Sequence, residues 1–291
     1  MAPDTIIGRA DELGAVERFF DGELSGARGL LIEGDAGIGK TTVWREAVRI
    51  AEGAGSVLTS RASEAEVRLS FTVLGDLLVP ALNDDLFAEL PVGQRRGLEA
   101  ALLLAEHSST RPDARAVSLA VLAVLRALAR TGTLTIAMDD LQWVDAPSAR
   151  ALTFALRRLE AEPVTVVAAR RVEPGAGEPL DLVHNLPGGL QRITLTPLGE
   201  GSLGRLLRRR LDREFPPPLV RRIHEASGGN PFFGLEIGRA LAAGDAEPRP
   251  GEPLPLPADL KELLRDRLSA LSDGARSVLL IAAASVHPTP A

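Results

Sequence analysis

The stretch from Gly34 to Thr42, which reads GDAGIGKTT, sets three glycines ahead of a lysine and two threonines. It fits the pattern G-x-x-x-x-G-K-[ST], between an apolar run and a helical pattern. Glycines let backbone N–H groups converge on phosphate oxygens, and the helix start adds its positive dipole end. Lys40 is expected to contact the β- and γ-phosphates, and the Thr41 hydroxyl to coordinate Mg²⁺. The expected nucleotide contacts of the loop are Gly37, Ile38, Gly39, Lys40, Thr41 and Thr42.

Lysine is rare in this chain, which makes its presence in the loop informative. Of the 33 lysines and arginines, only Lys40 and Lys261 are lysines. A compact ammonium reaches between phosphate oxygens in a way that a planar guanidinium does not. Lysine at position 40 therefore favours a phosphate contact over a chance glycine turn ahead of a helix.

An acidic pair, Asp139-Asp140, follows the apolar run TLTIAM at 133–138. Ligands of parallel α/β sheets bind at the carboxyl ends of the strands, so an acid there would lie beside the phosphates. We expect Asp139 to hold Mg²⁺, directly or through water, and Asp140 to orient or polarise the attacking water. The alternative is that both aspartates cap the next helix, although Asp145, which stands shortly before Pro147, is a better cap. The expected catalytic residues are thus Lys40, Asp139 and Asp140.

Short apolar runs alternate with helical patterns along most of the chain. This alternation predicts an α/β fold with a parallel five-stranded sheet flanked by helices. The expected strands are 29–33, 56–61, 133–138, 164–170 and 190–195. The expected helices among them are 10–24, 40–51, 70–82, 93–106, 113–130 and one opened by Pro147, with a polar stretch, NDDLFAELPVGQRRG, in between.

The run SVLTSR at 56–61 lies between Lys40 and Asp139 in the sequence. It leaves room for an extra strand between the phosphate-loop strand and the aspartate strand. Such an insertion is typical of the ATPase branch of phosphate-loop proteins rather than of simple kinases or G proteins. G proteins would also need a guanine-reading Asn-Lys-x-Asp, and the chain has no Asn-Lys pair.

The pattern becomes helical after Thr196 and is then interrupted by a Pro-rich run, GDAEPRPGEPLPLP. Helices are expected at 199–212, 217–227, 232–243, 258–271 and 273–284. The last segment is too short for an independent domain, so we expect the complete protein to be longer. The expected organisation is a P-loop nucleotide-binding domain, a helical lid, a linker and a further partial domain, at 1–196, 197–243, 244–257 and 258–291.

Composition excludes several classes of function. The net charge of −6 argues against a surface that coats nucleic acid. Cysteine is absent, which excludes disulfides and thiolate metal sites and fits a reducing compartment. The N-terminus has no apolar signal segment, and the longest apolar stretch, 278–284, is too short to span a bilayer. The sequence therefore predicts a cytoplasmic protein without a membrane partner.

Five motifs occur in the order IIGRADEL, GDAGIGKTT, MDDLQWVD, VTVVAARR and ASGGNPFFGLEIGRAL. Together they resemble the ATPase module of large ATP-binding LuxR-type regulators, within the signal transduction ATPases with numerous domains (STAND). The resemblance covers nearly the whole chain. It implies a STAND-type P-loop ATPase of AAA-like fold, with ATP or ADP and Mg²⁺ as ligands and a role in transcription regulation.

The resemblance also implies roles for single residues. Ile7, Gly8 and Arg9 would lie over the adenine or ribose, and Pro231 of the GGNPFF turn would close over the adenine from the helical lid. The segment 258–291 would begin a winged-helix domain. The effector, a small ligand or a protein, is not identified by any motif, and DNA would be bound only through a domain absent from this chain.

The end of the fourth strand supplies the expected sensor of the γ-phosphate. By the same resemblance this is Arg170, a further catalytic residue, with the adjacent Arg171 as its rival.

Two of these motifs have a simpler interpretation when they are read from the residues alone. Arg9 then predicts only an ion pair with Asp11 or Glu12 on a surface helix. The run from Gly228 to Pro231 reads as a helix stop, a turn and a new helix start.

The acidic pair departs from the pattern of many ATPases of this branch, in which glutamate follows the Mg²⁺ aspartate. Asp140 is one methylene shorter, and hydrolysis depends on holding water in line with the phosphate. We therefore expect a nucleotide-operated regulatory switch with slow ATP turnover. The alternatives are a ring-forming ATPase machine with brisk turnover and a small-molecule kinase, and the extra strand and the Pro231 turn disfavour the kinase.

Overall fold

The computed structural model describes residues 6–22, 26–104, 112–172, 177–243, 254 and 272–284. The chain divides into two compact units, Met1–Thr196 and Pro197–Ala291. Within the described part of the chain, no helix combines the length and the apolar character needed to cross a bilayer.

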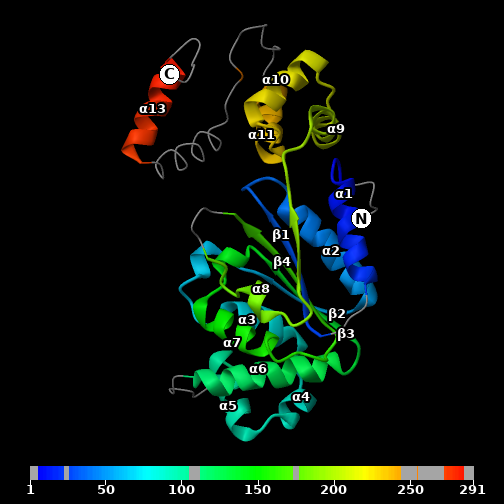
Figure 1. The fold of residues 1–291 in the computed structure, drawn as a ribbon, viewed down its shortest axis with the longest axis vertical. Coiled ribbons are helices and arrows are strands. Elements are labelled where there is room, and N and C mark those ends of the chain that lie inside the picture. Colours follow the sequence, from blue (N-terminus) through cyan, green and yellow to red (C-terminus); the bar gives the residue numbers. More distant parts are fainter. Residues whose placement is uncertain are drawn as a thin grey trace. The chain divides into compact units, whose positions relative to one another are not determined.

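The first unit is built on a five-stranded sheet (Figure 1). Every pair of neighbouring strands is parallel, and the strand order is β2-β3-β4-β1-β5. The parallel five-stranded α/β fold predicted from the alternating pattern is confirmed. The strands are β1 (Arg28–Gly34), β2 (Gly55–Arg61), β3 (Thr133–Asp139), β4 (Val164–Arg171) and β5 (Leu190–Thr194).

A strand does separate the phosphate-loop strand from the aspartate strand, but it is not the one that the sequence suggested. β4 lies between β1 and β3, whereas β2, which contains the run SVLTSR, lies at the edge of the sheet. Order along the chain does not fix order in the sheet, because each parallel crossover can pass over a neighbouring strand.

Helices cover both faces of the sheet (Figure 1). The side chains of alternate strand residues pack on opposite faces. Leu30 and Ile32 of β1 pack with α1 (Ala10–Asp21) and α2 (Lys40–Ala54), while Leu31 packs on the opposite side. The buried run at 30–32 is therefore apolar throughout, as a strand covered on both faces requires. The opposite layer contains α3 (Thr72–Leu78), α5 (Val92–Ala101), α6 (Ala114–Ala129) and α7 (Ala146–Leu156).

Two short helices lie where the sequence predicted none. α4 (Asp84–Glu89) occupies the stretch interpreted as polar, and the Asn83 side chain caps it by accepting from Leu86 N at 2.9 Å. α8 (Leu182–Asn185) lies in the connection between β4 and β5. The expected helix 93–106 ends early, at Ala101, and Leu103 follows with φ 56°.

The second unit is helical. α9 (Glu200–Leu211), α10 (Pro217–Ser227) and α11 (Pro231–Ala243) share an apolar core, and α13 (Asp273–Ala284) follows later in the chain. Residues 244–253 and 255–271 lie outside the described residues, as do 285–291. These include most of the expected linker 244–257 and much of the expected winged-helix segment 258–291. The core side chains are Leu203, Leu207, Leu219, Ile223, Ile237 and Leu241.

Candidate functional site

The glycine-rich loop joins the end of β1 to the start of α2. Gly37 has φ 75° and Gly39 has φ 104°, a left-handed backbone that glycine adopts without strain. Gly39 is the N-terminal cap of α2, and no side chain accepts a hydrogen bond there. The first turn of an α-helix leaves its N–H groups without backbone partners inside the helix. An anion at this point would meet those groups and the positive end of a 15-residue helix.

Lys40 is buried, with 8% of its surface exposed, and folds back over the loop. Its Nζ donates to Gly34 O at 3.1 Å and to Asp35 O at 2.8 Å. Burial lowers the pKa of the Lys40 ammonium, and the charge of Arg171 adds to that effect, while nearby aspartates act in the opposite direction. The ammonium thus lies against the backbone of the glycine-rich loop. A phosphate could replace its two carbonyl contacts there.

Asp139 ends β3 and is 3% exposed. Burial raises the pKa of its carboxyl, and the neighbouring Asp140 charge adds to the shift. A hydrogen bond with the Thr41 side chain opposes it. The structure thus joins the two residues that the sequence nominated for Mg²⁺, at one end of the sheet.

A hydroxyl and a carboxylate are the oxygen ligands that Mg²⁺ prefers, usually completed by water and substrate phosphates. Among the described residues, no group of three or more His, Cys, Asp or Glu side chains could hold a metal ion. The donor set therefore fits an ion that arrives with a phosphate ligand.

Replacing Asp139 with asparagine is expected to raise the melting temperature of the Mg²⁺-free protein at neutral pH. The pKa of Asp139 in the folded state lies above that of the unfolded chain, so its charge destabilises the fold at neutral pH. The Thr41 hydroxyl can donate or accept and remains satisfied. The gain should shrink as the pH falls through the raised pKa, because Asp139 then takes up its proton. Thermal melts over a pH series check this, and a gain that grows on acidification would contradict burial as the main cause.

Asp140 follows with a left-handed backbone, φ 54° and ψ 50°. Its carboxylate accepts a hydrogen bond from Gln142 Nε2 at 2.8 Å. The alternative role as a helix cap belongs instead to Asp145, which accepts from Ser148 N at 2.9 Å. Asp145 also accepts from the backbone N–H groups of Phe71 and Val73, contacts that the sequence did not predict.

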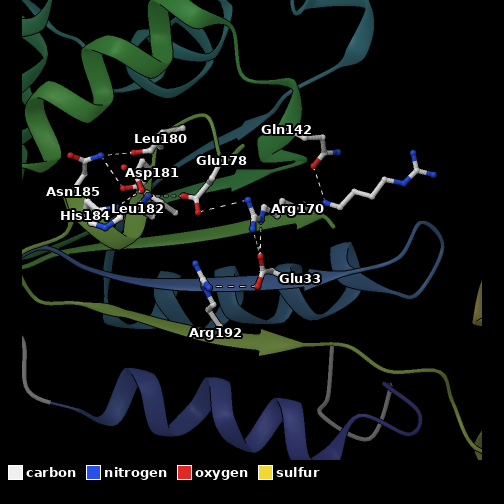
Figure 2. A network of polar contacts seen from close by, with 11 residues as sticks. Glu33, Gln142, Arg170, Glu178, Leu180, Asp181, Leu182, His184, Asn185 and Arg192 are labelled. Carbon is white, nitrogen blue, oxygen red and sulfur yellow. Dashed lines mark hydrogen bonds and ion pairs between the residues drawn. The ribbon is translucent and has the colours of Figure 1, made fainter. Parts of the chain in front are cut away.

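Arg170 lies in a network of ion pairs rather than in the loop. Figure 2 shows its guanidinium between Glu33 and Glu178, with Arg192 on the other side of Glu33. The distances are 2.6 Å from Arg170 Nη2 to Glu33 Oε1 and 3.9 Å from Nη1 to Glu178 Oε2. Glu33 and Arg170 are direct register partners on β1 and β4. Arg171, in contrast, acts electrostatically on Lys40.

Arg9 is 4% exposed and ties three segments together. Nη1 donates to Glu12 Oε1 at 2.8 Å and to Thr196 O at 2.7 Å, and Nη2 donates to Ile38 O at 2.8 Å. The ion pair with Glu12 agrees with the simpler interpretation of Arg9. The bonds to the loop and to Thr196 were not predicted, since both partners are remote in sequence. Of the other two residues expected near the adenine or ribose, Gly8 is exposed and Ile7 is half-buried.

Replacing Arg9 with alanine is expected to lower the melting temperature by roughly 6–12 °C, from the loss of about 3 kcal/mol. The change removes the donor to Ile38 O, which is buried, and to Thr196 O and the Glu12 carboxylate, which are partly buried. Arg18→Ala removes an exposed arginine from α1, the helix that Arg9 precedes, and serves as the matched control. Equal melting temperatures for the two variants would contradict the assignment of Arg9 as a buried tether.

The turn before α11 belongs to the second unit. Gly228 and Gly229 have φ 57° and 72°, and Asn230 Oδ1 accepts from Phe232 N at 3.0 Å. A side chain at position 229 would meet Leu198 O at 2.5 Å, so glycine is required. Pro231 then opens α11 at the first helical position, where proline lacks no needed bond. The turn is thus a helix stop followed by a capped helix start, as the residues alone predicted.

Comparisons with known proteins place the fold. The family model of the AAA ATPase domain matches residues 5–167, more than half of the chain. A search of curated proteins finds no match.

Several solved structures are similar to this chain at low identity. The Thermotoga maritima RuvB Holliday junction branch migration motor is 16% identical, with 96% of this chain and 76% of that chain covered and a TM-score of 0.47. The Aeropyrum pernix ORC1 protein in complex with DNA is 20% identical, with 98% and 74% covered and a TM-score of 0.49.

A STAND protein with a tetratricopeptide repeat sensor from Pyrococcus horikoshii is 14% identical. The match covers 97% of this chain and 35% of that chain, with a TM-score of 0.38. The assignment itself rests on the family model, whose match includes the glycine-rich loop, Lys40 and the acidic pair. The chain belongs to the AAA ATPase domain family.

Proposed function

We propose that this chain is an adenine-nucleotide-operated switch that binds ATP or ADP with Mg²⁺ and hydrolyses ATP slowly. The observation that carries the proposal is the start of α2, where no side chain caps the helix, Lys40 folds over the loop, and Thr41 bonds to Asp139. Each of these groups suits a phosphate with its metal ion. Family membership supports nucleotide binding independently.

The residues divide the work as follows. The backbone of residues 37–42 binds the phosphate oxygens, and Lys40 contacts the β- and γ-phosphates in place of its two carbonyl partners. Thr41 and Asp139 would hold Mg²⁺. When bound, the ion neutralises charge on the phosphates and fixes their orientation. Asp140 orients the attacking water.

We assign the γ-phosphate sensor to Arg171 rather than to Arg170. The Arg170 guanidinium, 18% exposed, is already paired with Glu33, which is 9% exposed. Moving it to a phosphate would take from a buried carboxylate its closest partner, a costly change, because Arg192 lies 3.9 Å from the other carboxylate oxygen. The Arg171 charge is felt at Lys40. Successive side chains of a strand point to opposite faces, so only one of the two arginines faces the loop.

The two arginine variants should therefore behave differently. Arg171→Gln is expected to reduce the preference for ATP over ADP about tenfold, the value of one charge-assisted contact. Arg170→Gln is expected to lower the melting temperature and to keep the preference. Calorimetric titration with both nucleotides and thermal melts check this. The reverse pattern would return the sensor to Arg170.

The role of the nucleotide as a latch rests on the resemblance to LuxR-type STAND regulators. We propose that Ile7, Gly8 and Arg9 bind the adenine or ribose from one side and that Pro231 closes over the adenine from the helical lid. A ligand gripped from two sides shifts a conformational equilibrium only through its differential affinity. DNA binding would then belong to another domain of a transcription regulator, the effector would act on the same equilibrium, and the chain would work in the cytoplasm.

The experiment is to denature the purified protein and identify the released nucleotide by chromatography, then to measure steady-state hydrolysis. Near-stoichiometric ADP or ATP with turnover far below the ~10 s⁻¹ typical of enzymes is expected for a switch. An empty protein with brisk hydrolysis and ATP-driven oligomers would favour a ring-forming machine instead.

A further inference from the structure

Gln142 joins the two strand ends that border the phosphate loop. It lies in the 3₁₀ helix η4 (Leu141–Trp143), directly after the acidic pair. Its Nε2 donates to Asp140 Oδ1 at 2.8 Å, and its Oε1 accepts from Arg171 N at 3.0 Å. Figure 2 shows the side chain at the end of the sheet, on the same side as Arg170. One amide therefore bridges the proposed water-orienting carboxylate and the last residue of β4.

The bridge fits only one kind of side chain. A carboxylate only accepts hydrogen bonds and a backbone N–H only donates, so the residue between them must offer a donor and an acceptor together. A carboxamide does so, and the contacts fix which end is oxygen and which is nitrogen. Glutamate would lack the donor, methionine would lack both groups, and asparagine would be one methylene too short.

The backbone does not make this connection. The ladder between β3 and β4 ends at Met138 and Ala168, whereas β4 continues beside β1 to Arg171. Gln142 supplies the acceptor that a longer β3 would have provided. Its Nε2 is also a hydrogen-bond donor to the Asp140 carboxylate. Gln142 thus helps to fix the direction in which that carboxylate points.

We propose that Gln142 is a positioning residue for hydrolysis, which holds the Asp140 carboxylate against the end of β4 and keeps it in register with Arg171. The inference rests on the proposed function. One carboxylate oxygen is fixed by the amide, which leaves the other oxygen to the water. Because Arg171 N is the second anchor, a shift of the β4 end that carries the sensor moves the carboxylate as well. Gln142 would act through Asp140 rather than by its own contact with nucleotide or water.

The test begins with Gln142→Met, which keeps the length and apolar bulk of the side chain but removes both hydrogen bonds. Single-turnover hydrolysis is expected to slow by about 10²-fold, the effect of a misplaced reacting group. Nucleotide affinity is expected to stay within about threefold of wild type, because the phosphate contacts are untouched. Gln191→Met, at an exposed position of β5, is the matched control and should change neither quantity. A Gln142→Met protein that hydrolyses ATP at the wild-type rate would overturn the proposal.

A reversed pair separates positioning from folding. Gln142→Glu alone sets two carboxylates against each other and should lower the melting temperature. Adding Asp140→Asn restores a donor and an acceptor with exchanged roles, and the glutamate still accepts from Arg171 N. The double variant is expected to regain the melting temperature, while its turnover stays as low as that of Asp140→Asn. A double variant no more stable than Gln142→Glu would show that the contact is absent and the proposal wrong.

Failure of the proposed function appears elsewhere, in the wild type. If the wild-type protein binds no nucleotide, both the proposed function and the positioning role are wrong. If the wild-type protein binds and hydrolyses ATP and Gln142→Met hydrolyses it at the same rate, only the positioning role is wrong.

Discussion

Replacing Lys40 with alanine is expected to weaken ATP and ADP binding by about 10- to 150-fold while the fold stays intact. The change removes a charge-assisted hydrogen bond to phosphate, worth roughly 1.5–3 kcal/mol. The loop from Gly34 to Thr42 contains no second cationic side chain that could replace it. The free protein loses only two carbonyl contacts of the ammonium, at Gly34 and Asp35. Calorimetric titration with each nucleotide measures the effect.

Two further variants make the Lys40 result specific. Arg45→Ala removes a positive charge from an exposed position of the same helix and should leave affinity near that of wild type. Lys40→Arg keeps the charge but should bind poorly, because a planar guanidinium does not fit between phosphate oxygens as a compact ammonium does. Wild-type affinity in Lys40→Ala would remove the phosphate site from this loop.

Replacing Asp140 with asparagine is expected to slow ATP hydrolysis by about 10²- to 10⁴-fold, the usual contribution of a positioned acid–base group. Affinity for Mg²⁺-bound nucleotide should change little, since the Asp140 carboxylate is proposed to face the water. Asp139→Ala should instead affect binding, so that nucleotide affinity no longer responds to Mg²⁺. Single-turnover hydrolysis and titrations with Mg²⁺ or with a chelator separate the two effects.

The Asp139→Ala and Asp140→Asn variants serve as controls for each other, because each removes one negative charge from the same turn. If the two variants match in both Mg²⁺ response and turnover, the separate roles of metal ligand and water-orienting base are wrong. Asp145→Asn is unsuitable as a control, since Asp145 accepts from three backbone N–H groups and its loss would disturb the fold.

The sequence predicted the strands better than their order. A buried parallel strand reads as a short apolar run, as β1, β3 and β4 do, whereas β2 and β5 lie at the edges of the sheet and alternate buried with exposed residues. Nothing in the run at 164–170 tells that β4 inserts between β1 and β3, since lateral order depends on crossovers that leave no local pattern. α4 was missed for another reason. Its signals, Asn83 as cap and two aspartates in the first turn, were present but the helix has only 6 residues.

The site also contains residues that the sequence predicted and contacts that it could not predict. Lys40, Thr41 and Asp139 belong to motifs whose spacing follows from local geometry, and the structure brings them to one end of the sheet. The partners of Arg9 and Arg170 could not be predicted, because Ile38, Thr196 and Glu33 are adjacent only after folding. Gln142 had one available signal. It stands two residues after a candidate catalytic aspartate, within reach of its carboxylate, and it carries both a donor and an acceptor.

The position of Arg9 decides where this polypeptide can be shortened. Arg9 precedes α1, so a truncated gene product that begins at Ala10 would retain every helix and strand found among the described residues of the first unit. It would nevertheless lose the donor shared by Ile38 O and Thr196 O. A boundary drawn from secondary structure alone would therefore yield a protein that has its full topology and a loosened phosphate loop. Expression trials should keep residues 9 and 196 on the same fragment.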